Sequence, residues 1–217
     1  MIKLNKFNLN VIHETNHYIV VEKPSGILSQ EDITKDPNMM DIIKDYLKVK
    51  YNKPGNVFLG LVHRLDRMTS GLMVYAKTSK GASRISDAIR NKQVTKKYIC
   101  LVEGILSGKG TLTDKVIFDE KLLKAKVSDS GKEAILKYNV LEHIDGNTIL
   151  EVELITGRHH QIRLQLSNIS HPLVGDTLYG SKTKCNIKLH AYYLKLIDPV
   201  SKEEIEFIKY PNWYNKK

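Results

Sequence analysis

The sequence predicts a strand-rich α+β fold, and three observations support it. Apolar and polar residues alternate along residues 134–140 and 150–154, which is typical of half-buried antiparallel strands. Residues 39–50 and 82–89 instead repeat apolar side chains every three or four positions, as amphipathic helices do. The composition, 41% hydrophobic and 27% charged, is that of an ordinary globular protein. A mostly antiparallel sheet with a few helices is therefore expected.

The first elements follow from local signals. Tyr18–Val21 is short and β-branched, and Lys23–Gly26 contains a proline and a glycine, so a strand is expected to run into a loop. Asp36–Pro37 offers a helix cap and a first-turn proline ahead of residues 39–50. A helix is expected there.

Two further apolar runs enclose a polar loop. Val57–Val62 and Leu72–Ala76 both have the composition of strands, and the loop between them contains Asp66. Ser79 is placed to cap the helix that covers residues 82–89.

In the second half, strands are also expected at Tyr98–Val102 and around residues 187–193, and a helix at Arg158–Ser167. Residues 104–131 are expected to form a basic surface insertion. No linker, repeat or low-complexity tract interrupts the 217 residues, so one domain over residues 1–217, with a core of about residues 18–210, is predicted.

Charge, cysteine content and the lack of long apolar stretches indicate which partners and which cell compartment to expect. Lys and Arg outnumber Asp and Glu by 34 to 24, giving a net charge of +10, which favours a polyanionic partner but also suits a basic protein with none. Cys100 and Cys185 lack metal-site spacing and are interpreted as reduced core thiols. Met1–Lys6 has no leader pattern, and no apolar stretch is long enough for a membrane span. A cytoplasmic protein that does not enter membranes is expected.

Asp66 is the most informative acid in the chain because Arg64 and Arg67 flank it. Nearby cations lower the pKa of a carboxyl group, so Asp66 is expected to be an anion that can act as a nucleophile. An aspartate between arginines is also compatible with a structural surface ion pair.

A longer pattern distinguishes these alternatives. The ten residues His63–Leu72, HRLDRMTSGL, resemble the signature of the RluA family of pseudouridine synthases. Ile19–Gly26 and Thr156–Arg163, the latter continued by His171–Asp176, resemble two further blocks of that family, and Lys96–Tyr98 resembles a fourth element. The resemblance covers the chain from about Tyr18 to Tyr193.

The resemblance implies the pseudouridine synthase fold, a mixed and mostly antiparallel central sheet with flanking helices and loops. It also implies isomerisation of uridines in structured RNA to pseudouridine, by a nucleophilic aspartate that acts on a flipped base, without a cofactor. The implied catalytic residues are Asp66, Tyr98, which stacks on the uracil, and Arg163, which pairs with Asp66. The residues implied to bind substrate are Arg64, which fills the place of the flipped nucleotide, Leu164, His63 and His160.

One departure from the family pattern is visible, because His159 stands where the family has Thr. A surface substitution is the favoured interpretation. No metal site is expected at His159 and His160, since neighbouring residues on a helix point about 100° apart. Lys121–Lys126 is left open between a mobile segment and an RNA contact.

The target is also left open between ribosomal RNA and transfer RNA, and a monomer is expected. Only about 17 residues precede the first core strand, so the S4 RNA-binding domain of many family members is expected to be absent. Two alternatives to the synthase remain: an RNA-binding or chaperone module with little catalysis, and another base-flipping enzyme such as a glycosylase.

Overall fold

The computed structural model describes residues 5, 6 and 8–215. The segment Met1–Lys6, in which no leader is expected, lies largely outside them. The chain forms two compact units: a first unit that ends at Val94 and also includes Tyr193–Lys209, and a second unit of Thr95–Tyr192 and the residues from Tyr210 onward. The single domain expected over residues 1–217 stays a prediction. Within the described residues, no helix is long and apolar enough to cross a membrane.

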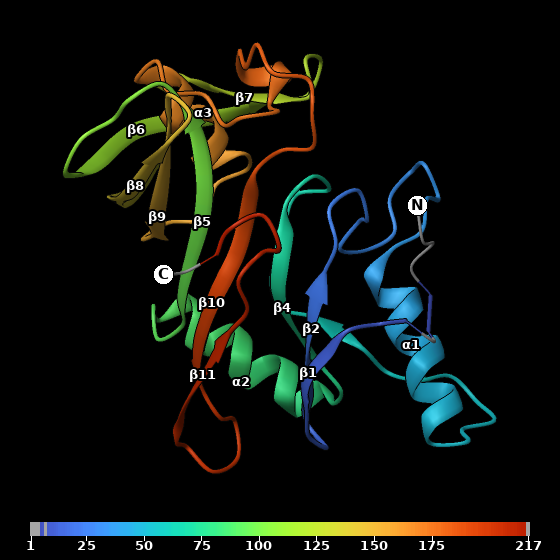
Figure 1. The fold of residues 1–217 in the computed structure, drawn as a ribbon. Coiled ribbons are helices and arrows are strands. Elements are labelled where there is room, and N and C mark those ends of the chain that lie inside the picture. Colours follow the sequence, from blue (N-terminus) through green and yellow to red (C-terminus); the bar gives the residue numbers. More distant parts are fainter. Residues whose placement is uncertain (1–4, 7, 216–217) are drawn as a thin grey trace. The chain divides into compact units, whose positions relative to one another are not determined.

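The first unit is built on antiparallel strands (Figure 1). Strand β2 (Tyr18–Lys23) pairs on one side with β1 (Val11–Glu14) and on the other with β4 (Ser70–Ala76). Two further antiparallel pairs are present: β3 (Gly60–Leu61) pairs with β4, and β11 (Glu204–Ile208) pairs with β10 (Leu189–Ile197). Strand β10 begins in the second unit and ends in the first.

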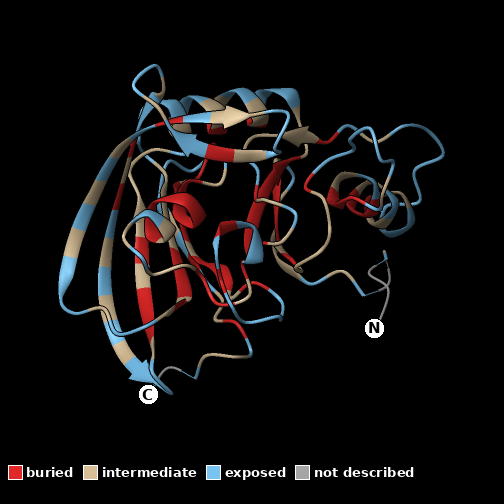
Figure 2. Ribbon diagram, turned by 90° about the horizontal axis from the view of Figure 1, so that it is seen from above, coloured by how far each residue is buried: buried red, intermediate tan, exposed pale blue. Residues whose placement is uncertain are grey.

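Apolar sequence determines the core of the first unit. Tyr18–Val21 and Leu72–Ala76 are almost completely buried, as expected for strands with apolar residues on both faces. The core packs side chains of these strands against α2 and the last strands: Tyr18, Val20, Leu72, Val74, Ile85, Leu194, Leu196 and Phe207. Buried residues are red in Figure 2. Both predicted strands are thus confirmed.

Both helices of the first unit begin one or two residues away from the predicted caps. Helix α1 (Met39–Lys50) starts after Asn38, whose side chain accepts the N–H of Asp41, so Asp36–Pro37 lies outside the helix. Helix α2 (Ser79–Arg90) is capped by Thr78 rather than Ser79. Its start needs Gly81, because a Cβ there would lie 2.7 Å from the carbonyl oxygen of His17.

The second unit contains five more strands, whose order is β5-β9-β8-β6-β7. They are β5 (Thr95–Glu103), β6 (Lys109–Asp119), β7 (Lys124–Val127), β8 (Lys132–Ile144) and β9 (Asn147–Leu154). The predicted alternation is confirmed, since Ala134 and Leu136 on β8 and Leu150 and Val152 on β9 are fully buried. The described pairs β5–β9, β9–β8, β8–β6 and β6–β7 are antiparallel.

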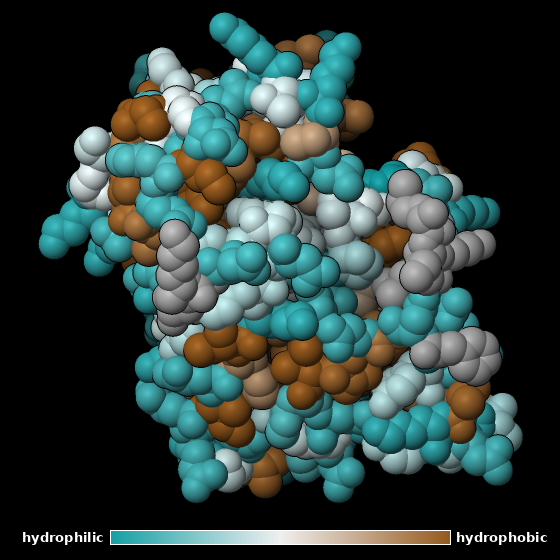
Figure 3. Space-filling model, viewed as in Figure 1, coloured by the Kyte–Doolittle hydropathy of each residue, from teal (hydrophilic) through white to brown (hydrophobic). Residues whose placement is uncertain are grey.

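Several sequence-based expectations for the second unit are wrong. Residues 104–131, expected to be a surface insertion without assigned strands, contain β6 and β7 of the sheet. Helix α3 (Gln161–Asn168) begins three residues after the predicted start at Arg158, and Cys185 is exposed rather than in the core. A short 3-10 helix, η1 (Thr177–Tyr179), follows α3. On the face drawn in Figure 3, hydrophilic residues predominate and apolar ones are scattered among them.

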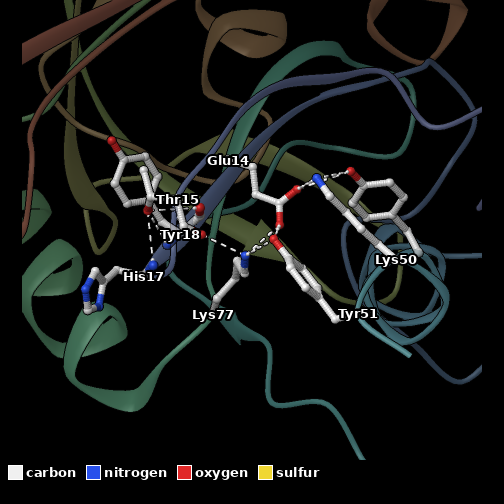
Figure 4. Close-up of polar contacts among 8 residues, drawn as sticks. Glu14, Thr15, His17, Tyr18, Lys50, Tyr51 and Lys77 are labelled. Atoms are coloured by element: carbon white, nitrogen blue, oxygen red, sulfur yellow. Dashed lines mark hydrogen bonds and ion pairs between the residues drawn. The ribbon is translucent and has the colours of Figure 1, made fainter. Parts of the chain in front are cut away.

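A buried carboxylate connects β1 to α1 and to the end of β4 (Figure 4). Glu14 accepts bonds from Lys50 (2.7 Å), Lys77 (2.6 Å) and the Tyr51 hydroxyl (2.7 Å), and its side chain is only 7% exposed. Although burial alone would raise the pKa of Glu14, the bonds from Lys50, Lys77 and Tyr51 lower it from an ordinary 4.5 to about 2.

We expect Glu14→Gln to lower the free energy of unfolding by about 2–3 kcal/mol at neutral pH, because Lys77 is left buried without its anion. A carboxyl group with a lowered pKa stabilises the fold fully above its ordinary pKa and loses that contribution as the pH falls through the lowered value. The difference between wild type and variant should therefore shrink between pH 4.5 and about 2, as measured by urea unfolding.

Glu204→Gln is the matched control, since it removes the more exposed Lys195–Glu204 pair of 3.2 Å. Its effect should stay below about 1 kcal/mol. A Glu14→Gln variant that matches this control at neutral pH would contradict the assigned role of Glu14.

Candidate functional site

Asp66 lies in the loop of the β3–β4 hairpin, between the two apolar runs as predicted. The loop is held by a bond from the N–H of Thr69 to the carbonyl oxygen of Asp66 (3.0 Å). Next to it, buried Leu65 exchanges two hydrogen bonds with the Ser29 hydroxyl, of 2.7 and 3.1 Å. Asp66 is half-buried, whereas Arg64 and Arg67 are exposed. The carboxylate thus sits on a fixed turn.

Lys23 holds this turn from the end of β2. Its ammonium group is fully buried and donates to three carbonyl oxygens, those of Pro24 (3.1 Å), Ile27 (2.7 Å) and Arg67 (3.0 Å). The N–H of Gly26 also donates to Arg67 O (2.8 Å), and the Ser25 hydroxyl donates to the next carbonyl along. The loop after β2 is therefore tied to the loop that carries Asp66.

The charges around Asp66 differ from the sequence-based expectation. Arg67 pairs with Asp36 at 2.7 Å, and its Nε donates to the carbonyl oxygen of Gly26. Burial lowers the pKa of Lys23 to about 7, and the negative charge of Asp66 opposes this shift. Lys23 therefore interacts electrostatically with Asp66, which the sequence did not indicate.

His63 has a structural contact in the same hairpin. Its Nε2 accepts the backbone N–H of Val74 on β4 at 3.0 Å, so that nitrogen carries no proton in this arrangement. The contact links the start of the Asp66 loop to β4. Substrate binding by His63 and Arg64 stays a prediction.

In the second unit, Arg163 forms a two-bond ion pair with Asp176. The distances are 2.6 Å from Nε and 2.8 Å from an Nη atom, and both residues are almost completely buried. The guanidinium group also lies 5.0 Å from the ring centre of Tyr179. Arg163 is therefore no ordinary surface arginine, and its predicted pairing with Asp66 stays a prediction.

His160 and Leu164 occupy the same neighbourhood. His160 precedes α3 in a left-handed conformation (φ 52°), and its Nδ1 lies 3.0 Å from the Tyr179 hydroxyl. Burial, followed by the charges of Arg163 and His159, lowers the pKa of His160 to about 3, so the ring is neutral at pH 7. Leu164 is buried in the core with Tyr179, which leaves its predicted contact with substrate untested.

Tyr98 lies on β5, opposite Val152 of β9, and is 5% exposed. Its neighbour Lys97 pairs with Glu151 at 3.2 Å. This burial suits a residue of the core as well as the wall of a base pocket, so the predicted stacking of Tyr98 on the uracil stays a prediction.

Sequence reasoning assigned no role to Lys23, Asp176 and Tyr179. Lys23 and Asp176 lie within the stretches Ile19–Gly26 and His171–Asp176 that resemble the family, and Tyr179 lies three residues after the second. The signal that could identify Lys23 is its place at the end of a strand that begins with the apolar run Tyr18–Val21, because a buried ammonium group must have compensating acceptors. His159 and His160 precede α3 instead of lying on it, so the helical-angle argument against a metal site does not apply to them.

Comparison with known proteins gives consistent matches. The family model described as RNA pseudouridylate synthase matches residues 17–168. The ribosomal large subunit pseudouridine synthase D of Vibrio cholerae is 35% identical over 218 residues, which cover 92% of this chain and 66% of that protein. The synthase C of Buchnera aphidicola is 31% identical, with 94% and 69% covered. The chain thus spans about two thirds of the length of these curated relatives.

Two solved structures are similar in fold. Human RNA pseudouridylate synthase domain containing 4 aligns with a TM-score of 0.78 at 23% identity, covering 94% of this chain and 89% of that one. The domain-containing 1 protein aligns with the same TM-score at 24% identity, covering 99% and 88%. The shared fold confirms the predicted fold class.

We expect Asp176→Asn to lower the free energy of unfolding by about 3–5 kcal/mol, because the buried guanidinium group of Arg163 loses its counter-charge. Urea unfolding measures the effect. Asp36→Asn, which breaks the exposed pair with Arg67, is the control and should cost less than about 1 kcal/mol. Equal effects of the two substitutions would contradict this assignment.

Lys23→Met tests the buried ammonium group through its pH dependence. Between pH 7 and 10.5 the unfolded chain binds a proton at Lys23 that the folded chain holds less firmly, so the stability of the wild type should rise with pH relative to the variant. Unfolding curves at several pH values give this difference. A difference that stays constant over this range would contradict the lowered pKa.

Proposed function

Since the chain belongs to the RNA pseudouridylate synthase family, we propose that it isomerises uridines of RNA to pseudouridine. The observation that carries the proposal is the position of Asp66. This aspartate lies half-buried in a turn that three carbonyl contacts of Lys23 hold in place, and within the block that resembles the family signature. A nucleophile needs such a fixed position to approach a single carbon atom of the sugar.

The reaction replaces the carbon–nitrogen glycosidic bond with a carbon–carbon glycosidic bond. The bond between uracil N1 and ribose C1′ breaks, the base rotates, and C5 forms a bond to C1′. C5 then loses its proton and N1 gains one, so atoms and charge balance without a cofactor. Asp66 either attacks C1′ or assists formation of a glycal intermediate.

The other predicted residues have distinct roles in the proposal. Tyr98 stacks on the uracil, and Arg163 keeps Asp66 ionised. Arg64 takes the place of the uridine flipped out of the RNA, since a stacked base hides its glycosidic bond. His63, His160 and Leu164 shape the substrate site.

The substrate proposed first is large-subunit ribosomal RNA, because the similar proteins from Vibrio cholerae and Buchnera aphidicola are named for the ribosomal large subunit. Transfer RNA is the alternative. The chain is proposed to act as a monomer in the cytoplasm and to need no metal. The net charge of +10 suits an RNA partner.

We expect Asp66→Asn to lower kcat for pseudouridine formation by roughly 10⁴-fold or more, because the amide is no nucleophile at C1′. RNA affinity should stay within about threefold, since Asn has nearly the same shape. Mass spectrometry of digested RNA measures the product, and filter binding measures the affinity.

Asp145→Asn is the matched control. Asp145 is exposed in the β8–β9 turn with a φ of 49°, a conformation that Asn tolerates well, so this variant should retain full activity. An Asp66→Asn enzyme that still forms pseudouridine would contradict the proposal. Release of free uracil by the wild type would indicate a glycosylase.

Tyr98→Phe keeps the ring but removes the hydroxyl. We further propose that the Tyr98 hydroxyl moves the C5 proton. We therefore expect KM to stay within about threefold and kcat to fall by roughly 10²-fold. Tyr98→Leu should also raise KM by losing the stack. Steady-state kinetics separates the effects, and unchanged kcat in Tyr98→Phe would limit Tyr98 to stacking.

A further inference from the structure

An aromatic pair stands at the surface of the second unit. The rings of Phe118 and His159 lie 4.0 Å apart between centres, at an angle of 30°, so they are nearly stacked. Phe118 comes from β6, and His159 comes from the turn before α3. His159 is exposed and Phe118 is half-buried, which leaves a ring surface open to solvent.

Buried contacts support both rings. Phe118 is opposite Ala125 of β7, which is 1% exposed and whose N–H donates to the Tyr179 hydroxyl at 2.7 Å. His159 lies 4.3 Å from the ring of His160, whose Nδ1 contacts the same hydroxyl at 3.0 Å. Because both supports meet at Tyr179, the pair is held in one position.

One cation adjoins this pair: exposed Arg158 directly precedes His159, and its Nε donates to the carbonyl oxygen of Glu133 at 2.8 Å. An aromatic surface next to an arginine suits an unpaired nucleotide, whose base stacks while its phosphate is attracted.

We propose that Phe118 and His159 form a stacking platform for an unpaired base of the RNA substrate. Tyr98, the residue proposed to stack on the reacting uridine, is buried on β5 and is not one of the two platform rings. The platform gives a role to His159, the residue that departs from the family pattern. The inference rests on the proposed function for its RNA ligand.

His159→Ala and Phe118→Leu test the platform. We expect either change to raise KM for pseudouridine formation in an unmodified large-subunit ribosomal RNA transcript by about tenfold, with kcat within about twofold, because one base stack is lost. His159→Phe should stay within about threefold of wild type, since it keeps a ring. His143→Ala, which removes an exposed histidine from β8, is the control and should leave KM unchanged.

The affinity for the same transcript is measured separately by filter binding, with each variant placed in the Asp66→Asn background so that no turnover occurs. A tenfold weaker affinity in His159→Ala, restored in His159→Phe, supports the platform. Wild-type affinity in both His159→Ala and Phe118→Leu overturns it, as does a fall in kcat without a change in KM. A wild-type enzyme that forms no pseudouridine refutes the proposed function, and the affinities then decide the platform alone.

Discussion

The position of Asp66 depends on the hydrogen bonds that the buried ammonium group of Lys23 donates. Transfer of a charged group from water into a protein is costly unless hydrogen bonds replace its hydration, and here three carbonyl oxygens do so. Lys23 lies opposite Gly71 in the β2–β4 register, so the two loops leave the sheet side by side. Gly71 permits this departure with a φ of 125°. One side chain thus fixes both loops.

The second unit uses the same principle at Arg163. Its guanidinium group is buried against the carboxylate of Asp176, and a two-bond geometry is the arrangement that best offsets desolvation of both charges. Tyr179 then connects this pair to His160 and to Ala125 of β7. A buried polar network therefore determines the start of α3, the β6–β7 hairpin and the aromatic pair that they carry.

Sequence patterns predicted the parts of the fold in which apolar residues are continuous or strictly alternate, such as β2, β4, β8 and β9. They did not predict β6, because Asp114 takes one of its inward positions, where it accepts a bond from Gln165 at 2.7 Å. They also did not identify Lys23 or Asp176 as ion partners, since such pairing depends on contacts between distant segments. The blocks that resemble the family contain Asp66 and Arg163, whereas the pairing of Arg163 with Asp176 became visible only in three dimensions.

Nucleotide-resolution mapping of pseudouridine in total RNA, from cells with and without this protein, tests whether the protein forms pseudouridine. One or a few uridines, first of all in large-subunit ribosomal RNA, should lose the modification when the protein is absent. The same uridines should regain it when the wild-type gene is restored. Identical pseudouridine maps in the presence and absence of the protein would contradict the account.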